Sequence, residues 1–443
     1  MPADLSALYK TIQKRSLEIP AIEARGRLVR ATGLTLEAIG CQLQTGQRCL
    51  IAPHHGAPVE AEVVGFDRDR LFLMPLDRAQ GLSPGDPVIP LHNDSRVPTG
   101  PGLLGRVING AGEPLDGKGP LESGPTIPLH GDTINPLKRR PVSEPLDVGI
   151  RAINGLLTVG MGQRLGLFAG SGVGKSVLLG MMTRFTTADV VVVGLIGERG
   201  REVREFIEHT LGEEGMAHAV VIAAPADEPP VLRLRASLLC HRVAEGFRDQ
   251  GLNVLMLMDS LTRYAQAQRE IALAIGEPPA TKGYPPSVFS MIPSLVERAG
   301  NGEDENGSIT AFYTVLSEGD DQQDPIADAS RAILDGHIVL NRELAESGHY
   351  PAIDIEASIS RVMPQVTDQD HQQAANKFRK AWSIYRQNKD LLTLGAYRAG
   401  SNPALDEAIR LYPMMEGMLQ QKMREQTSWP ESRQRLLHLL GDN

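Results

Sequence analysis

Short apolar runs, broken at close intervals by Gly, Pro, Asn and Asp, characterise the chain from about residue 19 to residue 91. Clear examples span residues 27–29, 48–51, 59–66 and 71–74. Strands of this length, separated by turn residues, are typical of a small antiparallel barrel. We therefore predict a β-barrel domain over residues 19–91.

A different pattern begins after residues 92–145, a Gly- and Pro-rich stretch that we interpret as the lead-in to the next domain. Beyond it, apolar runs of strand length alternate with stretches of helical apolar spacing. This alternation predicts a parallel sheet with helices on both faces, and we assign residues 92–366 to this domain. The strand-length runs span residues 165–168, 190–196, 219–223, 254–258 and 309–316.

Helical spacing marks both ends of the chain. Apolar side chains between residues 5 and 12 fall on one side of a short helix, and residues 1–18 are either a frayed tail or a docking arm. From residue 367 onward apolar positions again recur at helical spacing, which predicts a C-terminal helical domain over residues 367–443. Within it, residues 420–435 are polar, and we expect them to fray.

The composition is that of an ordinary soluble globular protein, with 41% apolar and 22% charged residues among 443. The formal net charge of −9 and the 4% aromatic content argue against nucleic-acid binding, which needs a basic surface and stacking platforms. No apolar run approaches the roughly 18 residues of a membrane span. The three cysteines form no C-x-x-C pair, so we expect a reducing, cytoplasmic location.

The candidate chemistry centres on residues 166–176, which read GLFAGSGVGKS between a predicted strand and a predicted helix. Three glycines at alternate positions allow successive backbone N–H groups to turn toward one anion at the start of a helix. Lys175 adds a positive charge for the outer phosphates of a nucleotide, and the Ser176 hydroxyl is a ligand for Mg²⁺. The motif G-x-x-x-x-G-K-[ST] is matched except at its first position, which is an alanine. We expect the nucleotide to contact Ala169, Gly170, Ser171, Gly172, Val173, Gly174, Lys175, Ser176 and Val177.

Two acidic residues follow other strands of the predicted sheet. Asp259 comes directly after the run VLMLM, about 84 residues beyond Lys175, and an aspartate in this position can hold the hydration shell of Mg²⁺. Glu198 follows another apolar run and can act as the base that polarises water for attack on the γ-phosphate of ATP. Alone, Asp259 would be interpreted as a helix cap and Glu198 as part of a structural ion pair. Because ligands of open α/β sheets lie beyond the carboxyl ends of the strands, we expect both residues to meet the loop.

Taken together, the motifs and their order resemble those of the catalytic subunits of rotary ATP synthases and of their relatives in protein export. AGSGVGKS is followed by GERGRE, then by MDSLTRYA, and late in the chain by GHYPAIDIEASISRV. The segments TAFYTVLSEGDDQQDPIADASRAILDGHIVL and YRAGSNPALDEAI are most similar to the flagellum-specific ATPases of the bacterial type III export apparatus. The resemblance implies an N-terminal small β-barrel, a central RecA-like P-loop NTPase domain with a parallel sheet, and a C-terminal helical domain.

The resemblance also implies roles for individual residues. It identifies Glu198 as the catalytic glutamate, while Arg199 and Glu202 order the attacking water and the metal shell. Tyr350 falls where the family stacks an aromatic ring on adenine, and Arg361 falls where it places an arginine finger. The implied catalytic residues are Lys175, Glu198, Arg199 and Arg361, and the implied Mg²⁺ site comprises Ser176, Glu202 and Asp259.

A chain that carries both Glu198 and Arg361 can build every active site of a ring from one gene product, so a homohexamer with sites at its subunit interfaces is implied. The C-terminal region lacks the acidic DELSEED-like segment of the synthase subunit, which favours ATP hydrolysis over synthesis. The implied function is that of a cytoplasmic, Mg²⁺-dependent ATPase of flagellar protein export, which binds ATP and ADP and associates peripherally with the inner-membrane export apparatus. The implied partners are a regulatory protein at the N-terminal helix, a coiled-coil stalk, chaperone–substrate complexes and the membrane export gate.

Three alternatives stay open at this point. The first is a virulence type III secretion ATPase, whose sequences differ in the same segments by modest substitutions. The second is a subunit of a rotary ATP synthase. The third is a hexameric nucleic-acid motor, against which the acidic balance and the low aromatic content argue.

Overall fold

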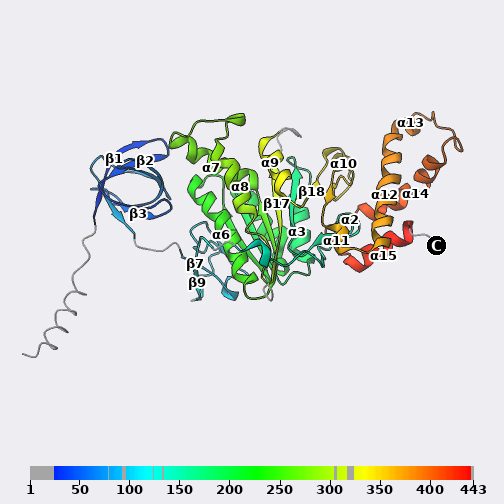
Figure 1. Ribbon diagram of the computed structural model, residues 1–443, viewed down its shortest axis with the longest axis horizontal. Helices are drawn as coiled ribbons and strands as arrows, with labels where there is room; N and C mark the ends of the chain where they lie inside the picture. Colours follow the sequence, from blue (N-terminus) through cyan, green and yellow to red (C-terminus); the bar gives the residue numbers. More distant parts are fainter. Residues whose placement is uncertain are drawn as a thin grey trace, which may run out of the picture. The chain divides into compact units, whose positions relative to one another are not determined.

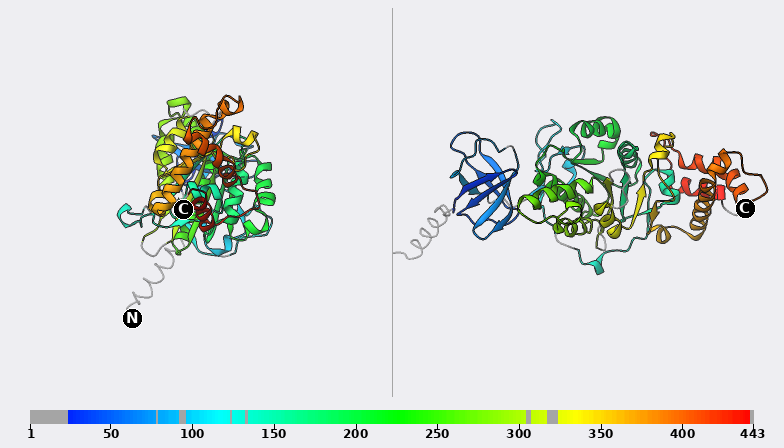
Figure 2. Two further views of the ribbon diagram at one scale, coloured as in Figure 1. Left: turned by 90° about the vertical axis from the view of Figure 1, so that its right-hand side faces the viewer. Right: turned by 90° about the horizontal axis from the view of Figure 1, so that it is seen from above.

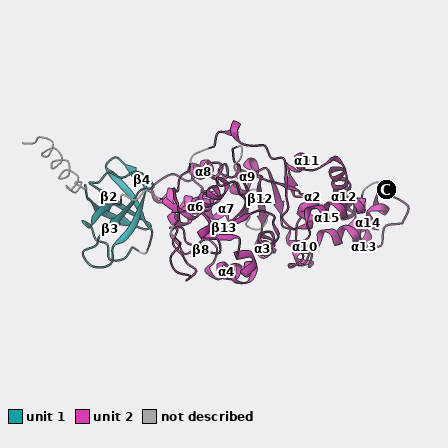
Figure 3. Ribbon diagram, turned by 90° about the horizontal axis from the view of Figure 1, so that it is seen from below, with its two compact units in different colours: residues 1–94 teal, residues 95–443 magenta. Residues whose placement is uncertain are grey.

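The chain folds into two compact units, residues 1–94 and residues 95–443, in a computed structural model (Figure 3). The structure describes residues 24–440 except 78, 92–95, 123, 132–133, 304–306 and 317–323. The docking arm predicted for residues 1–18 therefore lies outside the described residues. Among the residues described, no helix is long and apolar enough to cross a membrane.

The first unit contains the predicted small barrel, which is closed by six antiparallel strands in the order β1-β2-β5-β4-β3-β6 (Figure 1). The right-hand view of Figure 2 shows the barrel from above. Alternate side chains of β4, such as Val59, Ala61 and Val63, are buried in its interior. The strands are β1 (Gly26–Thr32), β2 (Thr35–Ile39), β3 (Arg48–Ile51), β4 (Val59–Asp67), β5 (Arg70–Pro75) and β6 (Pro87–Pro90).

The second unit is built on a nine-stranded sheet, along which the strands lie in the order β19-β18-β12-β17-β15-β13-β14-β8, with β16 paired to β17. Every pair is parallel except β18 with β19 and β16 with β17. The predicted parallel sheet is thus confirmed. The strands are β8 (Val107–Ile108), β12 (Arg164–Ala169), β13 (Val190–Ile196), β14 (Ala219–Ala224), β15 (Asn253–Asp259), β16 (Gly300–Asn301), β17 (Ser308–Leu316), β18 (Gly336–Val339) and β19 (Ile359–Ser360).

Helices cover both faces of this sheet, which explains why its strands are apolar without alternation. Successive residues of β13 point to opposite faces: Val191 and Val193 belong to one hydrophobic core, and Val190 and Val192 to the other. Helix α3 packs in the first core, and α6, α7, α8 and α9 contribute to the second. The bounds are α3 (Lys175–Phe185), α6 (Pro230–Arg248), α7 (Leu261–Ala274), α8 (Pro286–Val296) and α9 (Pro325–Ile333).

The C-terminal helices gather at one end of the second unit (Figure 1). They are α12 (Gln369–Gln387), α13 (Lys389–Thr393), α14 (Pro403–Leu419) and α15 (Trp429–Leu440), and three of them pack against α2 (Arg151–Leu156). Because they share a hydrophobic core with the sheet, we keep the separation of residues 92–366 from residues 367–443 as a proposal.

The expectation that residues 420–435 fray is wrong. Gln421 is buried, its side-chain oxygen accepts from the backbone N–H of Arg151 at 2.7 Å, and its amide donates to the carbonyl of Gly149 at 2.8 Å. Helix α15 then begins at Trp429. The polar side chains of this segment satisfy backbone groups that lie far away in the sequence, which a local pattern of polarity does not reveal.

Candidate functional site

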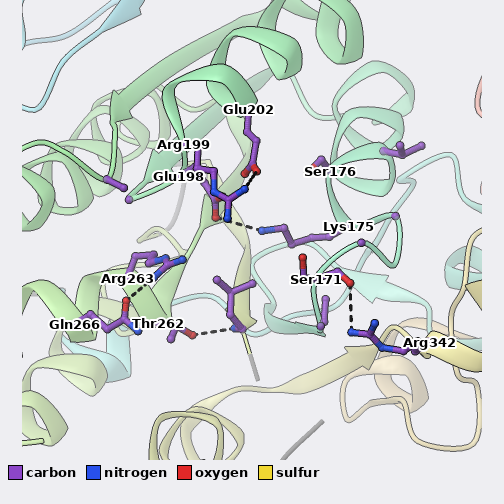
Figure 4. Close-up of a pocket in the computed structure, with 18 residues that line it drawn as sticks. Ser171, Lys175, Ser176, Glu198, Arg199, Glu202, Thr262, Arg263, Gln266 and Arg342 are labelled. Carbon is purple, nitrogen blue, oxygen red and sulfur yellow. Dashed lines mark hydrogen bonds and ion pairs between the residues drawn. The ribbon is translucent and has the colours of Figure 1, made fainter. Parts of the chain in front are cut away.

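A cavity of about 780 Å³ opens where β12 and β13 end (Figure 4). Its walls come from the loop after β12, the loop after β13 and the first turns of α7. This is the edge of the sheet at which open α/β folds bind their ligands. The predicted residues that line the cavity are Ala169, Gly170, Ser171, Gly172, Gly174, Lys175, Ser176, Val177, Glu198, Arg199 and Glu202.

The loop between β12 and α3 presents the start of a helix to the cavity. Gly174 occupies the N-cap position of α3 with φ of 90°, and Gly172 has φ of 80°. A residue with a Cβ adopts this left-handed region only with strain. The first N–H groups of an eleven-residue helix have no intrahelical partners, and the helix dipole favours negative charge beside them. The loop is therefore built to hold an anion.

Lys175 connects this loop to both acidic residues. Its Nζ lies 2.6 Å from Asp259 Oδ1 and 3.4 Å from Glu198 Oε1. Burial opposes the lysine charge, but the two carboxylates outweigh that effect and raise the pKa of Lys175. Asp259 is buried and accepts a second hydrogen bond at the same oxygen from Thr314 Oγ1, at 2.6 Å. Lys175 thus stays charged and is aimed at the point where the loop and two strand ends meet.

Glu198 is placed as an acid–base group. It directly follows β13 and Gly197, and its side chain is 14% exposed. Burial, together with the nearby charge of Asp259, raises the pKa of Glu198 to about 7, although Lys175 partly offsets this. A hydrogen bond with Glu202 and its charge add to the increase. A carboxyl group poised near neutral pH can accept a proton from water.

Glu202 and Arg199 form the outer wall of the cavity. Glu202 belongs to α4 (Gly200–Glu205), and Arg199 is the N-cap residue of that helix. Their side chains are 45% and 84% exposed and lie 3.7 Å apart, N to O. Because an ion pair this exposed contributes little to stability, separating the two side chains when a ligand binds costs little free energy.

Four polar side chains that line the cavity were not predicted from the sequence. Thr262, Arg263 and Gln266 project from the first turns of α7, and Arg263 Nη1 donates to Gln266 Oε1 at 2.8 Å (Figure 4). The sequence contained a signal for these three residues, because positions three and four apart share one face of a helix and this helix starts beside Asp259. Arg342 had no local signal. It lies in α10 (Arg342–Glu346), far along the chain, and donates to the carbonyl of Ser171 at 3.4 Å.

Four predicted residues do not line the cavity. Asp259 is buried and is connected to the cavity through its ion pair with Lys175. Val173 is buried in the hydrophobic core. Tyr350, which is 45% exposed, lines an adjoining cavity of about 660 Å³ together with Gly174 and Val177. Arg361 is exposed beyond β19, where its guanidinium donates to backbone carbonyls at 3.3 and 3.5 Å. The arrangement within one chain thus unites the loop with the carboxylates, but not with Arg361.

The chain matches two known families along its length. Residues 149–360 match the ATP synthase alpha/beta family, nucleotide-binding domain, and residues 367–438 match the T3SS EscN ATPase C-terminal domain. A flagellum-specific ATP synthase from Pseudomonas aeruginosa is 64% identical over 425 residues, which are 95% of this chain and 94% of that protein. The corresponding protein from Salmonella typhimurium is 58% identical and is aligned over 98% of this chain and 97% of its own length.

Solved structures give the same result. The assembled ATPase EscN from the type III secretion system of enteropathogenic E. coli superimposes with a TM-score of 0.88 at 41% identity, covering 94% of this chain and 100% of that one. EscN in complex with its central stalk EscO superimposes with a TM-score of 0.86 at the same identity and coverage.

Proposed function

This chain belongs to the ATP synthase alpha/beta family as an ATP-hydrolysing ATPase of type III protein export, and from that premise we propose that its cavity hydrolyses MgATP to drive flagellar export. One observation carries the proposal: Lys175, Glu198 and Asp259 converge at the N-terminus of α3. Two relatives named for the flagellum, at 64% and 58% identity, are more similar to it than a type 3 secretion system ATPase from Xanthomonas euvesicatoria at 46% and EscN at 41%.

Binding of the triphosphate uses the loop and Lys175. The backbone N–H groups at the start of α3 receive phosphate oxygens, and the Lys175 ammonium, with three donors, adds contacts to the outer phosphates. Arg263 and Arg342 contribute further positive charge to the walls of the cavity. Tyr350, next to the loop, is positioned to stack on the adenine base.

A magnesium ion fits this set of residues only together with the nucleotide. Among the described parts of the chain, no group of three His, Cys, Asp or Glu side chains could hold a metal ion. Mg²⁺ prefers oxygen ligands and keeps several waters, so phosphate oxygens and the Ser176 hydroxyl would complete a site to which Asp259 and Glu202 bind through water. The ion supplies neutralisation of the charge that develops on the phosphates.

Glu198 is the proposed general base. Its raised pKa allows the carboxylate to accept a proton as water attacks the γ-phosphate, while Arg199 and Glu202 hold the surrounding water. We expect Glu198→Gln to lower kcat by about 10² to 10⁴, because positioned proton transfer is lost, while ATP binding persists. Glu205→Gln, at the end of the α4 helix that follows Glu198 and outside the cavity, is the matched control. Equal rates in both variants would rule out the assignment of Glu198.

Arg361 is proposed to act on the neighbouring subunit of a homohexamer. It does not line the cavity of its own chain, and an arginine finger supplied across an interface contributes about 10³ to 10⁵ in rate. Arg361→Ala should therefore retain ATP binding and lose nearly all turnover. Arg410→Ala, which alters another exposed arginine, should keep both ATP binding and turnover. Turnover at the wild-type rate in Arg361→Ala would contradict the assignment.

In the cell, we place the enzyme in the cytoplasm, at the inner-membrane export apparatus. There it would engage chaperone–substrate complexes at the export gate, a coiled-coil stalk in the ring and a regulatory protein at residues 1–18. The solved complex of the similar ATPase EscN with its central stalk supports the stalk partner. A clean gene deletion tests the export system: loss of flagella and swimming is expected, whereas loss of effector secretion alone would identify a virulence system instead.

A further inference from the structure

The guanidinium of Arg361 rests on the C-terminal end of α9. Its Nη1 donates to the carbonyl of Leu334 at 3.3 Å, and its Nη2 donates to that of Arg331 at 3.5 Å. The backbone N–H of Arg361 also donates to the carbonyl of Asp335, at 3.0 Å. A helix C-terminus carries partial negative charge, so it is a favourable seat for a cation. The direction in which Arg361 points therefore depends on where this end of α9 lies.

Phe168 fixes the end of α9 against the sheet. The guanidinium carbon of Arg331 lies 4.7 Å from the centroid of the Phe168 ring, within cation–π range. The ring also meets His337 in an edge-to-face arrangement, with centroids 5.6 Å apart. Phe168 is 3% exposed, and Leu334, the residue that caps α9, is 2% exposed in the same hydrophobic core. The end of α9 and the ring thus form one packed cluster.

A glycine makes this close packing possible. A Cβ at Gly166 would lie 2.4 Å from Cε2 of Phe168 and 3.0 Å from Cδ1 of Leu334, so both side chains occupy the space above this glycine. Burial, and to a smaller extent the charges of Arg331 and Arg361, lower the pKa of His337, which agrees with the close approach of the two arginines to this histidine. Phe168 belongs to β12, and the residue that follows it is Ala169, the first of the phosphate loop.

We propose that Phe168 is a positioning residue for the finger Arg361, and that it links the phosphate loop of each subunit to the finger which that subunit offers to its neighbour. This inference rests on the proposed intersubunit role of Arg361. A shift of the loop on nucleotide binding moves β12, and the Phe168 ring carries that shift to Arg331, Leu334 and the seat of the guanidinium. Adjacent active sites in the ring are thereby coupled through one aromatic side chain.

Mixed rings test the proposal. Arg361→Ala chains keep a complete cavity but lack a finger, and Glu198→Gln chains bind ATP and offer a finger but cannot hydrolyse. Mixing the two should restore ATPase activity, because fingers of the second chain reach cavities of the first. Co-purification of an untagged chain with an affinity-tagged one confirms that mixed rings form. Phe168→Leu is then placed in either chain. In the finger donor it should lower the restored rate about tenfold, since a finger displaced by a fraction of an ångström stabilises the transition state less. In the finger-less chain it should lower the rate clearly less than in the finger donor, because there the seat holds no arginine and only the packing beside the phosphate loop is disturbed.

The outcomes distinguish failure of the intersubunit finger from failure of the proposed role of Phe168. No restoration in the parent mixture would overturn the intersubunit finger and with it this inference. Restoration, combined with an equal or larger loss when Phe168→Leu is in the finger-less chain, would overturn the inference alone, because Phe168 would then serve its own phosphate loop.

Variants of Arg331 in the donor chain test the contact with Phe168. Arg331→Lys should retain the restored rate, and Arg331→Met should lose it. Adding Phe168→Leu to Arg331→Met should lower the rate little further if the two side chains act as one contact. Additive losses would also overturn the inference.

Discussion

At the scale of single residues, the environment of Glu198 predicts a pH dependence. Burial and the charge of Asp259 raise the pKa of Glu198 to about 7, and the group must be ionised to accept a proton. Activity is therefore present above that pH and is lost below it. We expect kcat/KM for ATP to fall about tenfold for each pH unit below the inflection, as a single required base dictates. Steady-state assays at constant ionic strength measure this, and a flat profile from pH 5.5 to pH 8 would contradict the role of Glu198.

Lys175 gives a second prediction at this scale. Replacing it by Met removes the charge but keeps most of the buried stem, so phosphate contacts are lost while packing is retained. Hydrogen bonds to charged groups contribute about 1.5–3 kcal/mol each, which corresponds to roughly a 10- to 100-fold loss of ATP affinity. Binding of a fluorescent ATP analogue measures it, with Lys118→Met as a control in the same unit, outside the cavity. Unchanged affinity would contradict the assignment of Lys175.

Individual site residues could be predicted where the residues next to them in the sequence indicate their role. Lys175 and Ser176 are specified by a contiguous motif, and the positions of Glu198 and Asp259 follow from the rule that parallel strands end at one edge. Arg342 reaches the cavity from 171 positions along the chain through its contact with Ser171, and no pattern around it indicates that contact. The partner of Arg361 lies on another chain in our proposal, so only the family resemblance pointed to it.

At the scale of elements, the start of α3 depends on Gly174. Its φ of 90° is unfavourable for any residue with a Cβ, and an added Cβ would lie 3.3 Å from the ring of Tyr350. We expect Gly174→Ala to cost about 1–2 kcal/mol of backbone strain and to distort the loop, so that ATP affinity falls more than folding stability does. Thermal unfolding with and without ATP separates the two. Gly400→Ala is the control, because Gly400 also has a positive φ, of 86°, but lies in open space and lines neither cavity. A variant with normal ATP stabilisation would show that the loop tolerates the side chain.

The attachment of α12 is another property of an element. Arg379 donates to the carbonyls of Ile355, Ser358 and Leu156 at 2.6, 3.1 and 2.8 Å. These bonds connect α12 to the segment that leads into β19 and to the end of α2. Arg379→Met would leave these carbonyls without donors, and we expect a loss of about 2–4 kcal/mol in the free energy of unfolding. Urea unfolding measures the loss. Lys380→Met, its exposed neighbour on α12, should change stability by less than about 0.5 kcal/mol, and equal effects would contradict this role of Arg379.

Most elements of the sheet could be predicted because their chemistry is uniform. Strand β13 was predicted within its observed bounds, Val190–Ile196, since a fully buried parallel strand is apolar at every position. Strand β2 (Thr35–Ile39) was missed because Glu37 interrupts it, and the structure shows that Arg30 and Arg70 pair with this glutamate. Its charge is thus satisfied by neighbouring strands, and such partners are known only once the register of the barrel is known.

At the scale of the whole molecule, the separation of Arg361 from the cavity of its own chain makes activity a property of the assembly. If each active site needs an arginine from the adjacent subunit, a monomer binds ATP but hydrolyses it about 10³ to 10⁵ times more slowly than the ring does. ATPase activity per chain should therefore rise with protein concentration and level off where rings are complete, since interfaces form by mass action. Sedimentation over the same concentrations identifies the oligomer, and ATP affinity should vary far less than the rate. Constant activity per chain in samples that sediment as monomers would show that one chain holds a complete active site, and Arg361 would then need another role.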